Sequence, residues 1–237
     1  MVGLNAPALP LADPGNFTQA APMGEMDLRV PPGRTYKYFS NALFEMGSGL
    51  SLTTFQLSAA PSPSPSTDTN TGTHTAIGAA IGTGTGTGPA CLTSLSTSTP
   101  HAVCAVTLNV TNAGSMAGDV VVMAYFRSSR SKQEWQARRE AQGVRRHDGR
   151  ELLTPRKQLF DFARVKGVTA GSSVLLTFNV TAASIAEVDE GSGDLVSEAG
   201  SYELLFDNGD GSPRGVVSMA AAVAGAGAVL EPFPSEV

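Results

Sequence analysis

The chain is poor in aromatic and charged residues and has no long apolar run. Aromatics make up 6% of the 237 residues and charged residues 16%, so the core must consist mainly of Val, Leu and Ala with a few Phe. No run of about 18 apolar residues occurs, which excludes an ordinary membrane-spanning helix. A net charge of −5 argues against nucleic acid as a partner. We therefore predict one folded unit of about 100 to 125 residues, with no membrane and no nucleic-acid partner.

Residues that ligate metals or cofactors are also scarce. The three histidines, His74, His101 and His147, fit no metal-ligand spacing. The Gly-Thr repeat at 82–88 lacks the Gly-Lys-Ser/Thr ending of a phosphate-binding loop and follows no predicted strand. We predict no metal site and no cofactor.

Low-complexity sequence occupies residues 58–100. Its Pro-Ser and Gly-Thr repeats bury too little apolar surface to offset the entropy cost of ordering, so we predict a disordered insert. Cys91 falls inside this insert, whereas Cys104 lies 13 residues later in a predicted strand. The two thiols could pair in an oxidising compartment, where closing the loop would contribute roughly 3 kcal/mol, or they could remain free. We favour free thiols.

The remaining sequence predicts a β-sandwich. Residues 103–110 alternate between apolar and polar, 111–119 are rich in turn residues, and 120–126 form a second apolar run. Further strands are predicted at 157–165, 173–180, 194–197, 202–206 and 215–221. Short β runs with Gly and Asn at the joints indicate an all-β, immunoglobulin-like antiparallel sandwich over residues 101–224, with a tail at 225–237.

A basic insert interrupts this domain at 127–150. It holds eight Lys/Arg against three acids (Glu134, Glu140 and Asp148), which gives a local charge of +5. Residues 131–142 could form a short helix around Trp135. Binding to an anionic polymer is one interpretation of the insert, and a solvated loop between strands is the other. We favour the loop.

Two groups of carboxylates follow later in the chain. Glu187, Asp189 and Glu190 come after a polar turn, and Asp207 and Asp210 lie in a stretch rich in Gly and Asn. A calcium loop needs D-x-[DN]-x-[DN]-G and a distal Glu, and neither group has that spacing. We interpret both groups as solvated turns.

Residues 1–57 form a Pro- and Gly-punctuated segment with a cluster of aromatics near its end. The cluster consists of Tyr36, Tyr38, Phe39, Phe44 and Phe55. A free loop rarely carries so many aromatics, so we expect them to dock either on the sandwich or on a domain outside this chain. We favour a domain outside the chain. The opening residues 1–7 show no signal-peptide pattern.

Several motifs resemble a known enzyme family. Residues 32–39 read PGRTYKYF and residues 44–55 read FEMGSGLSLTTF. Both are similar to the segment that joins the second domain of glycoside hydrolase family 3 enzymes to their C-terminal fibronectin type III-like domain. The sequence NFTQAAPMGEMDLR at 16–29 resembles the β-xylosidase branch of that family. Further matches follow in the family's order at 106–118, 155–165, 170–178 and 199–202.

The resemblance implies a fibronectin type III-like sandwich after an extended linker, residues 1–57, that is similar to the end of the family's second domain. It further implies an extracellular, non-catalytic C-terminal module of a β-xylosidase or α-arabinofuranosidase-like enzyme. In such an enzyme the module would pack against the catalytic domains and stabilise them. The parent would hydrolyse terminal xylosyl units of plant-type cell-wall polysaccharide, which is a second possible partner.

No catalytic residue can be carried over from the family. Its nucleophile is an Asp that precedes a Trp, whereas the one tryptophan here, Trp135, follows Glu134. The family's acid/base Glu lies in the second domain, upstream of the matching region. We therefore assign no catalytic residue and expect the chain to be inactive alone.

Two other interpretations remain. A split hydrolase would need a separate polypeptide that carries the catalytic domains. A stand-alone immunoglobulin-like glycan-binding or adhesion module would need a flat platform of exposed aromatics. The candidates in the sandwich, most of them at inward-facing strand positions, are Tyr125, Phe126, Phe160, Phe162, Phe178, Tyr202 and Phe206.

Overall fold

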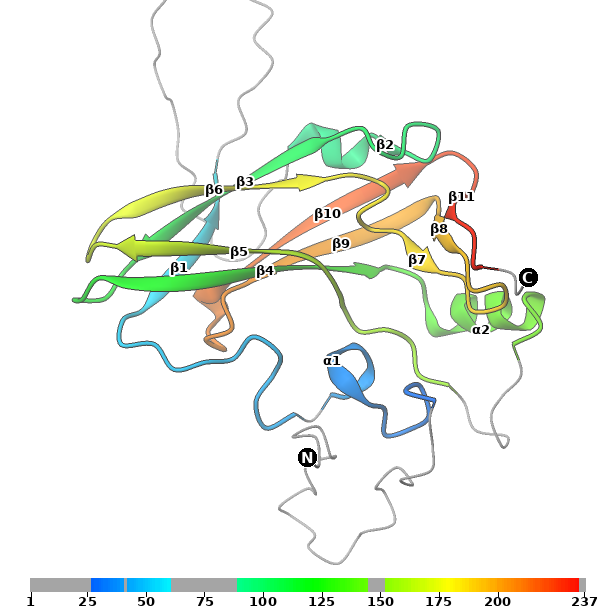
Figure 1. Ribbon diagram of the computed structural model, residues 1–237, viewed down its shortest axis with the longest axis horizontal. Helices are drawn as coiled ribbons and strands as arrows, with labels where there is room; N and C mark the ends of the chain where they lie inside the picture. Colours follow the sequence, from blue (N-terminus) through cyan, green and yellow to red (C-terminus); the bar gives the residue numbers. More distant parts are fainter. Residues whose placement is uncertain (1–26, 41, 61–88, 145–151, 235–237) are drawn as a thin grey trace, which may run out of the picture.

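The computed structural model describes residues 27–40, 42–60, 89–144 and 152–234. Two facing sheets form the body of the molecule (Figure 1). The smaller sheet has the order β1-β3-β6, with β1 at Phe55–Ala59, β3 at Cys104–Asn112 and β6 at Ser173–Val180. Its strand pairs are antiparallel.

The larger sheet has the order β2-β10-β9-β4-β5. Its strands are β2 (Leu95–Ser96), β4 (Gly118–Ser128), β5 (Gln158–Val168), β9 (Gly200–Asp207) and β10 (Val216–Ala224). The pairs are antiparallel, except that the short β2 runs parallel to β10. The predicted all-β antiparallel sandwich is confirmed.

Smaller elements surround the sandwich. A third sheet joins β11 (Ala228–Glu231), β8 (Leu195–Ser197) and β7 (Glu187–Val188). The helices are α1 (Thr35–Tyr38) and α2 (Lys132–Ala141), with 3-10 turns η2 (Ala90–Thr93) and η3 (Pro213–Gly215). In Figure 1, α2 lies beside β7 and β8, and α1 lies on the side of β4, away from β3 and β6.

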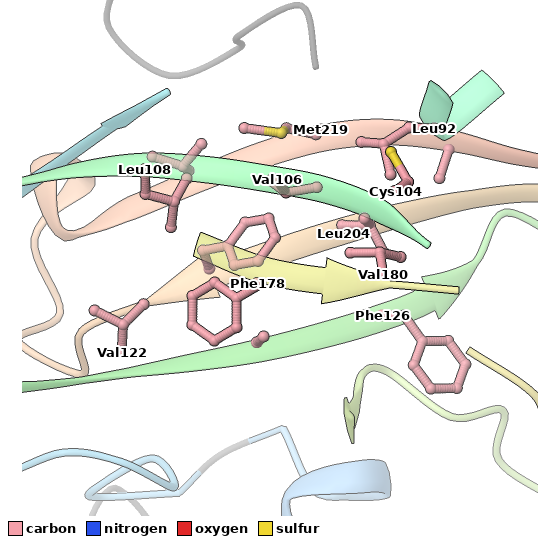
Figure 2. Close-up of a cluster of buried hydrophobic side chains, with 14 of the residues drawn as sticks. Leu92, Cys104, Val106, Leu108, Val122, Phe126, Phe178, Val180, Leu204 and Met219 are labelled. Carbon is pink, nitrogen blue, oxygen red and sulfur yellow. The ribbon is translucent and has the colours of Figure 1, made fainter. Parts of the chain in front are cut away.

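The core lies between the two large sheets, and its residues follow the two-residue period of the strands. In β3 every second side chain from Cys104 is buried, and β10 alternates in the same way. Figure 2 shows these side chains meeting between the sheets. Phe178 of β6 and Phe206 of β9 have ring centroids 5.2 Å apart, and this aromatic contact joins the two sheets.

Asn112 closes the end of this core. Its side chain is fully buried, and its amide donates to the carbonyls of Met116 (2.7 Å) and Val168 (2.8 Å). Its oxygen accepts from the Thr53 hydroxyl (2.7 Å) and the Gly114 N–H (3.0 Å). One amide therefore joins the linker, the β3–β4 turn and the end of β5.

The prediction of disorder over 58–100 is wrong at both ends of that range. β1 continues to Ala59, and residues 89–100 are ordered because Leu92 and Leu95 bury their side chains in the core. Cys91 forms a disulfide with Cys104, with Cα atoms 5.6 Å apart, so the preference for free thiols is also wrong. The intervening residues 61–88, which include His74 and the Gly-Thr repeat, lie outside the described residues.

Candidate functional site

The linker residues before the sandwich dock on its outer face. Tyr36 packs against Tyr125 with ring centroids 5.9 Å apart, and its hydroxyl accepts from the Leu159 N–H at 3.1 Å. Arg156 donates from its side chain to the Phe39 carbonyl at 2.7 Å. These contacts fix residues 36–39 against β4, β5 and the residues just before β5.

The aromatic cluster is therefore divided between two environments. Phe39 and Phe55 are buried, Tyr36 is half-buried against the sandwich, and Tyr38 is half-buried near Glu190 and Arg139. The preference for a docking partner outside the chain is wrong for these four residues. Phe44 alone in the cluster is highly exposed, at 79%.

Phe44 belongs to an exposed apolar strip, which we define as Leu43, Phe44, Met46, Leu50 and Leu52. Exposure of Leu43, Leu50 and Leu52 is 72%, 108% and 88%. The strip's backbone is held on β4, because the Tyr125 hydroxyl donates to the Met46 carbonyl at 3.2 Å. Gly47, at φ +92°, lies so close to Met123 that a Cβ would approach its sulfur to 2.9 Å. An anchored backbone that presents apolar side chains outward is typical of an interaction surface.

Helix α2 forms the centre of the basic insert predicted at 127–150. Ser131 and Glu134 form the capping box that begins the helix, and Trp135 is buried beneath it. The guanidinium groups of Arg130, Arg138 and Arg139 surround the Trp135 ring at 5.4, 5.6 and 5.7 Å from its centroid. The predicted helix around Trp135 is confirmed.

These arginines bind the first carboxylate group. Arg130 bonds Glu187 and Glu198, and Arg138 bonds Glu198 at 2.6 Å.

Arg139 bonds Glu190, and it also donates to the carbonyls of Leu152 and Leu153, both at 2.8 Å. Arg29 of the linker shares Glu190 and pairs with Asp27. The network ties the linker, α2 and the loop after β7 together.

Two predictions fail at this network. The described part of the basic insert, residues 127–144, is not a solvated loop, because its arginines are held by internal carboxylates. The carboxylate group 187–190 is not a solvated turn either, since Glu187 is only 4% exposed. Asp189 does accept turn hydrogen bonds from Gly191 and Ser192, both at 2.9 Å. The anionic-polymer interpretation loses support in the described part of the insert, because the charges of Arg130, Arg138 and Arg139 are neutralised within the chain. Arg145, Arg146 and Arg150 lie outside the described residues.

The second carboxylate group forms the predicted turn. Asp207 accepts from the Gly209 N–H at 2.7 Å, and Asp210 accepts from the Ser212 N–H at 2.7 Å. Between them Asn208 donates to the Phe55 carbonyl at 3.2 Å, which ties the turn to β1. Within the described ranges, no three His, Cys, Asp or Glu side chains are grouped so that they could hold a metal ion. His147 lies outside those ranges.

A cleft of about 500 Å³, here called the linker cleft, opens between the linker, α2 and the loop after β7. Lys37, Tyr38, Trp135, Gln158, Glu187 and Glu190 are among the residues that line it. Burial lowers the pKa of Lys37, against the opposing effect of Glu187 and Glu190. Burial also raises the pKa of Tyr38. Sequence reasoning missed this cleft because its walls come from segments far apart in the chain.

Comparison with known proteins gives a consistent result. The family described as "Fibronectin type III-like domain" matches residues 144–209. The probable exo-1,4-β-xylosidases bxlB of Aspergillus flavus and Aspergillus oryzae are 28% and 29% identical over 99% of this chain. The chain spans only about a quarter of their lengths, 26% and 25%.

Two solved structures share the fold. A GH3 exo-β-xylosidase (XlnD), in complex with a xylobiose aziridine probe, has a TM-score of 0.59 at 23% identity, covering 94% of this chain and 24% of that one. The β-glucosidase of Kluyveromyces marxianus in complex with glucose has a TM-score of 0.50 at 19% identity, covering 81% of this chain and 16% of that one. Among the described residues, no helix has the length and apolar character needed to cross a membrane.

Proposed function

We propose that this chain, which resembles the fibronectin type III-like region of glycoside hydrolase family 3, is the non-catalytic C-terminal module of a β-xylosidase or related α-arabinofuranosidase. The observation that carries the proposal is the alignment of 99% of the chain with about a quarter of fungal exo-1,4-β-xylosidases. The parent would remove terminal xylosyl units from plant-type polysaccharide, with catalytic carboxylates supplied by its other domains.

The module's role would be to pack against those domains and stabilise them. The exposed apolar strip supports this role, because it lies on a part of the surface to which the linker is anchored. The hydrogen bond from the Tyr125 hydroxyl to the Met46 carbonyl holds the backbone of the strip in place. The strip could therefore contact another domain without a change in its backbone conformation. Phe162 of β5, 64% exposed and paired in register with Met123, extends the apolar surface beside it.

The described carboxylates give no support for catalysis by this chain. Retaining glycosidases need one carboxylate free to attack and a second that exchanges a proton. Here Glu187, Glu190 and Glu198 are each bound by arginine. The Cys91–Cys104 disulfide supports an extracellular parent, because such bonds persist in oxidising compartments.

A stand-alone adhesion module with an aromatic platform has less support. Five of the seven sandwich aromatics are buried: Tyr125, Phe126, Phe178, Tyr202 and Phe206. Phe160 is partly buried, which leaves Phe162 as the exposed member of the set.

The first test is hydrolysis of an aryl β-xyloside and an aryl α-arabinofuranoside by the purified chain. We expect no turnover, and genuine turnover that is lost on unfolding would refute the non-catalytic assignment. The second test replaces the aligned quarter of the Aspergillus flavus relative with this chain. The chimera should fold and hydrolyse the xyloside.

The chimera also tests the apolar strip. Replacing Leu43, Phe44, Leu50 and Leu52 by Ser should lower the melting temperature of the chimera. The same substitutions in the 237-residue chain should leave its melting temperature nearly unchanged, because these side chains are exposed there. Equal effects in both contexts would contradict docking through the strip.

A further inference from the structure

The linker cleft contains polar side chains that no described part of the chain satisfies with a hydrogen bond. The Lys37 ammonium, the Tyr38 hydroxyl and the Gln158 amide all line it. Among the described residues, none of these three groups has a hydrogen-bond or ion-pair partner. All three residues are half-buried, so these groups have lost part of their hydration without a protein partner to replace it.

The carboxylates of the cleft differ from these three groups because arginines already bind them. Glu190 bonds Arg29 and Arg139, and Glu187 bonds Arg130. One carboxylate oxygen is an exception, because Glu187 Oε1 is buried without a hydrogen-bond partner among the described residues. The groups that remain available to a ligand are therefore a donor from Lys37, mixed donors and acceptors from Tyr38 and Gln158, and the acceptor Glu187 Oε1.

The charges of the lining define the class of ligand. Asp27, Glu187, Asp189 and Glu190 carry four negative charges, and Arg29 and Lys37 carry two positive ones. Arg130, Arg138 and Arg139, which pair with these carboxylates and with Glu198, bring the whole network to five charges of each sign. An anion would gain no net attraction from this neutral network and would face the carboxylates of the lining. A cation would meet the desolvated ammonium of Lys37 and carboxylates that are already paired. A neutral molecule with many hydroxyl groups satisfies the three available side chains without either penalty.

The apolar part of the lining suits the same class. Leu28 and Val188 lie at the cleft, together with the rings of Tyr38 and Trp135. Such surfaces accommodate the C–H faces of a sugar ring, and the volume of about 500 Å³ lies within the usual range of small-molecule sites. We infer that the linker cleft binds a neutral saccharide whose hydroxyls bond Lys37, Tyr38 and Gln158.

Trp135 provides the measurement, because it is the only tryptophan in the chain and it lines the cleft. The complete 237-residue chain is titrated with xylobiose, and Trp135 fluorescence is recorded. A saturable change is expected. The variants Lys37→Met and Tyr38→Phe leave the arginine–carboxylate network intact, and each should raise the Kd about tenfold. Their melting temperatures show whether the fold is retained.

A steric pair of variants locates the site independently. Val188→Phe adds bulk to an exposed residue that lines the cleft and should weaken binding. Leu175→Phe makes the equivalent change at an exposed position of β6 and should not. No fluorescence change at tens of millimolar of any sugar tested, or binding that none of the cleft variants alters, would overturn the inference. Tighter binding of glucuronate or spermidine than of neutral sugars would also overturn it.

Only the choice of xylobiose as first probe rests on the proposed function. Cellobiose is therefore titrated in parallel. Cellobiose binding that the cleft variants weaken, without xylobiose binding, would support the saccharide site while counting against a xylosidase parent. Inactivity of the chimera would bear on the parent alone, because the fluorescence titration uses no catalytic domain.

Discussion

Arg139 donates hydrogen bonds to both carboxylate oxygens of Glu190, with Nε at 2.8 Å from Oε2 and Nη2 at 3.0 Å from Oε1. This bidentate pair joins α2 to the loop after β7. The remaining donors of Arg139 reach the carbonyls of Leu152 and Leu153. Since Arg29 also bonds Glu190, the position of the linker depends on the same carboxylate.

Replacing Arg139 by Met should therefore destabilise the chain by about 3 kcal/mol, because it leaves a largely buried carboxylate with Arg29 as its remaining partner and takes the Arg139 donors from two carbonyls. Arg139→Lys keeps the positive charge but loses the planar guanidinium group that binds both carboxylate oxygens. The stability of this variant should therefore lie between those of wild type and Arg139→Met. Urea unfolding measures both. The control is Arg164→Met, whose pair with Asp119 is exposed, so its loss should change the free energy of unfolding far less. Equal losses at the two sites would contradict the assigned importance of the network.

A second prediction concerns Asn112. Aspartate has nearly the same shape but cannot donate, so Asn112→Asp would direct a carboxylate at the carbonyls of Met116 and Val168. We expect a loss of about 2 kcal/mol or more in the free energy of unfolding. The matched control is Asn109→Asp on the same strand, where the amide makes only a 3.5 Å contact with Thr111. A small effect at Asn112 would show that the two carbonyls find other donors.

Local patterns predicted the strands and α2 correctly. The alternation in β3 and the Ser131–Glu134 spacing are properties of neighbouring residues, so they are visible without tertiary structure. The pairing of Arg139 with Glu190 is not, because the two residues lie 51 positions apart and meet only when α2 packs beside β7. A +5 insert and a distant acidic run could be recognised separately, but their contact required the fold.

The order of residues 89–100 was missed for a different reason. The composition of the low-complexity segment around them is polar and repetitive, which concealed Leu92 and Leu95 as core residues. Cys91 was the available signal, because a second cysteine 13 residues later allowed a covalent tie to β3. The linker cleft gave no local signal, since Lys37 and Gln158, which both line it, lie 121 positions apart in the sequence (158 minus 37).

The disulfide should contribute about 3 kcal/mol, the value the loop-entropy model gives for a closed loop of this length. The double variant Cys91→Ala/Cys104→Ala should melt at a lower temperature than the oxidised wild type. Adding reductant should lower the wild-type melting temperature toward that of the double variant, which should itself not respond. Reaction of both thiols with a maleimide in the native, unreduced chain would contradict the pairing.

Acid should destabilise the fold, and Asp189 should account for part of the effect. Burial opposes its ionisation, but the N–H groups of Ser192 and Gly191, with Arg138, outweigh that effect and hold the pKa of Asp189 below its usual 3.8. The Lys157 ammonium likewise lowers the pKa of Glu45 from 4.5. Because both pKa values are lower in the folded state, the unfolded chain takes up protons first as the pH falls. Their contribution is therefore complete above about pH 5 and is lost progressively below the unfolded values.

The measurement is the melting temperature from pH 7 to pH 3 for wild type and Asp189→Asn. At pH 7 the variant should melt lower, because an amide replaces one of the two acceptor oxygens beside Gln142 and Arg138. The difference should shrink toward pH 3, where protonation removes the same charge from the wild type. The matched control is Asp161→Asn, at an exposed carboxylate on β5. The difference in melting temperature between this variant and wild type should stay nearly constant from pH 7 to pH 3. A difference between wild type and Asp189→Asn that stays constant over the whole range would show that the carboxylate's charge does not stabilise the loop.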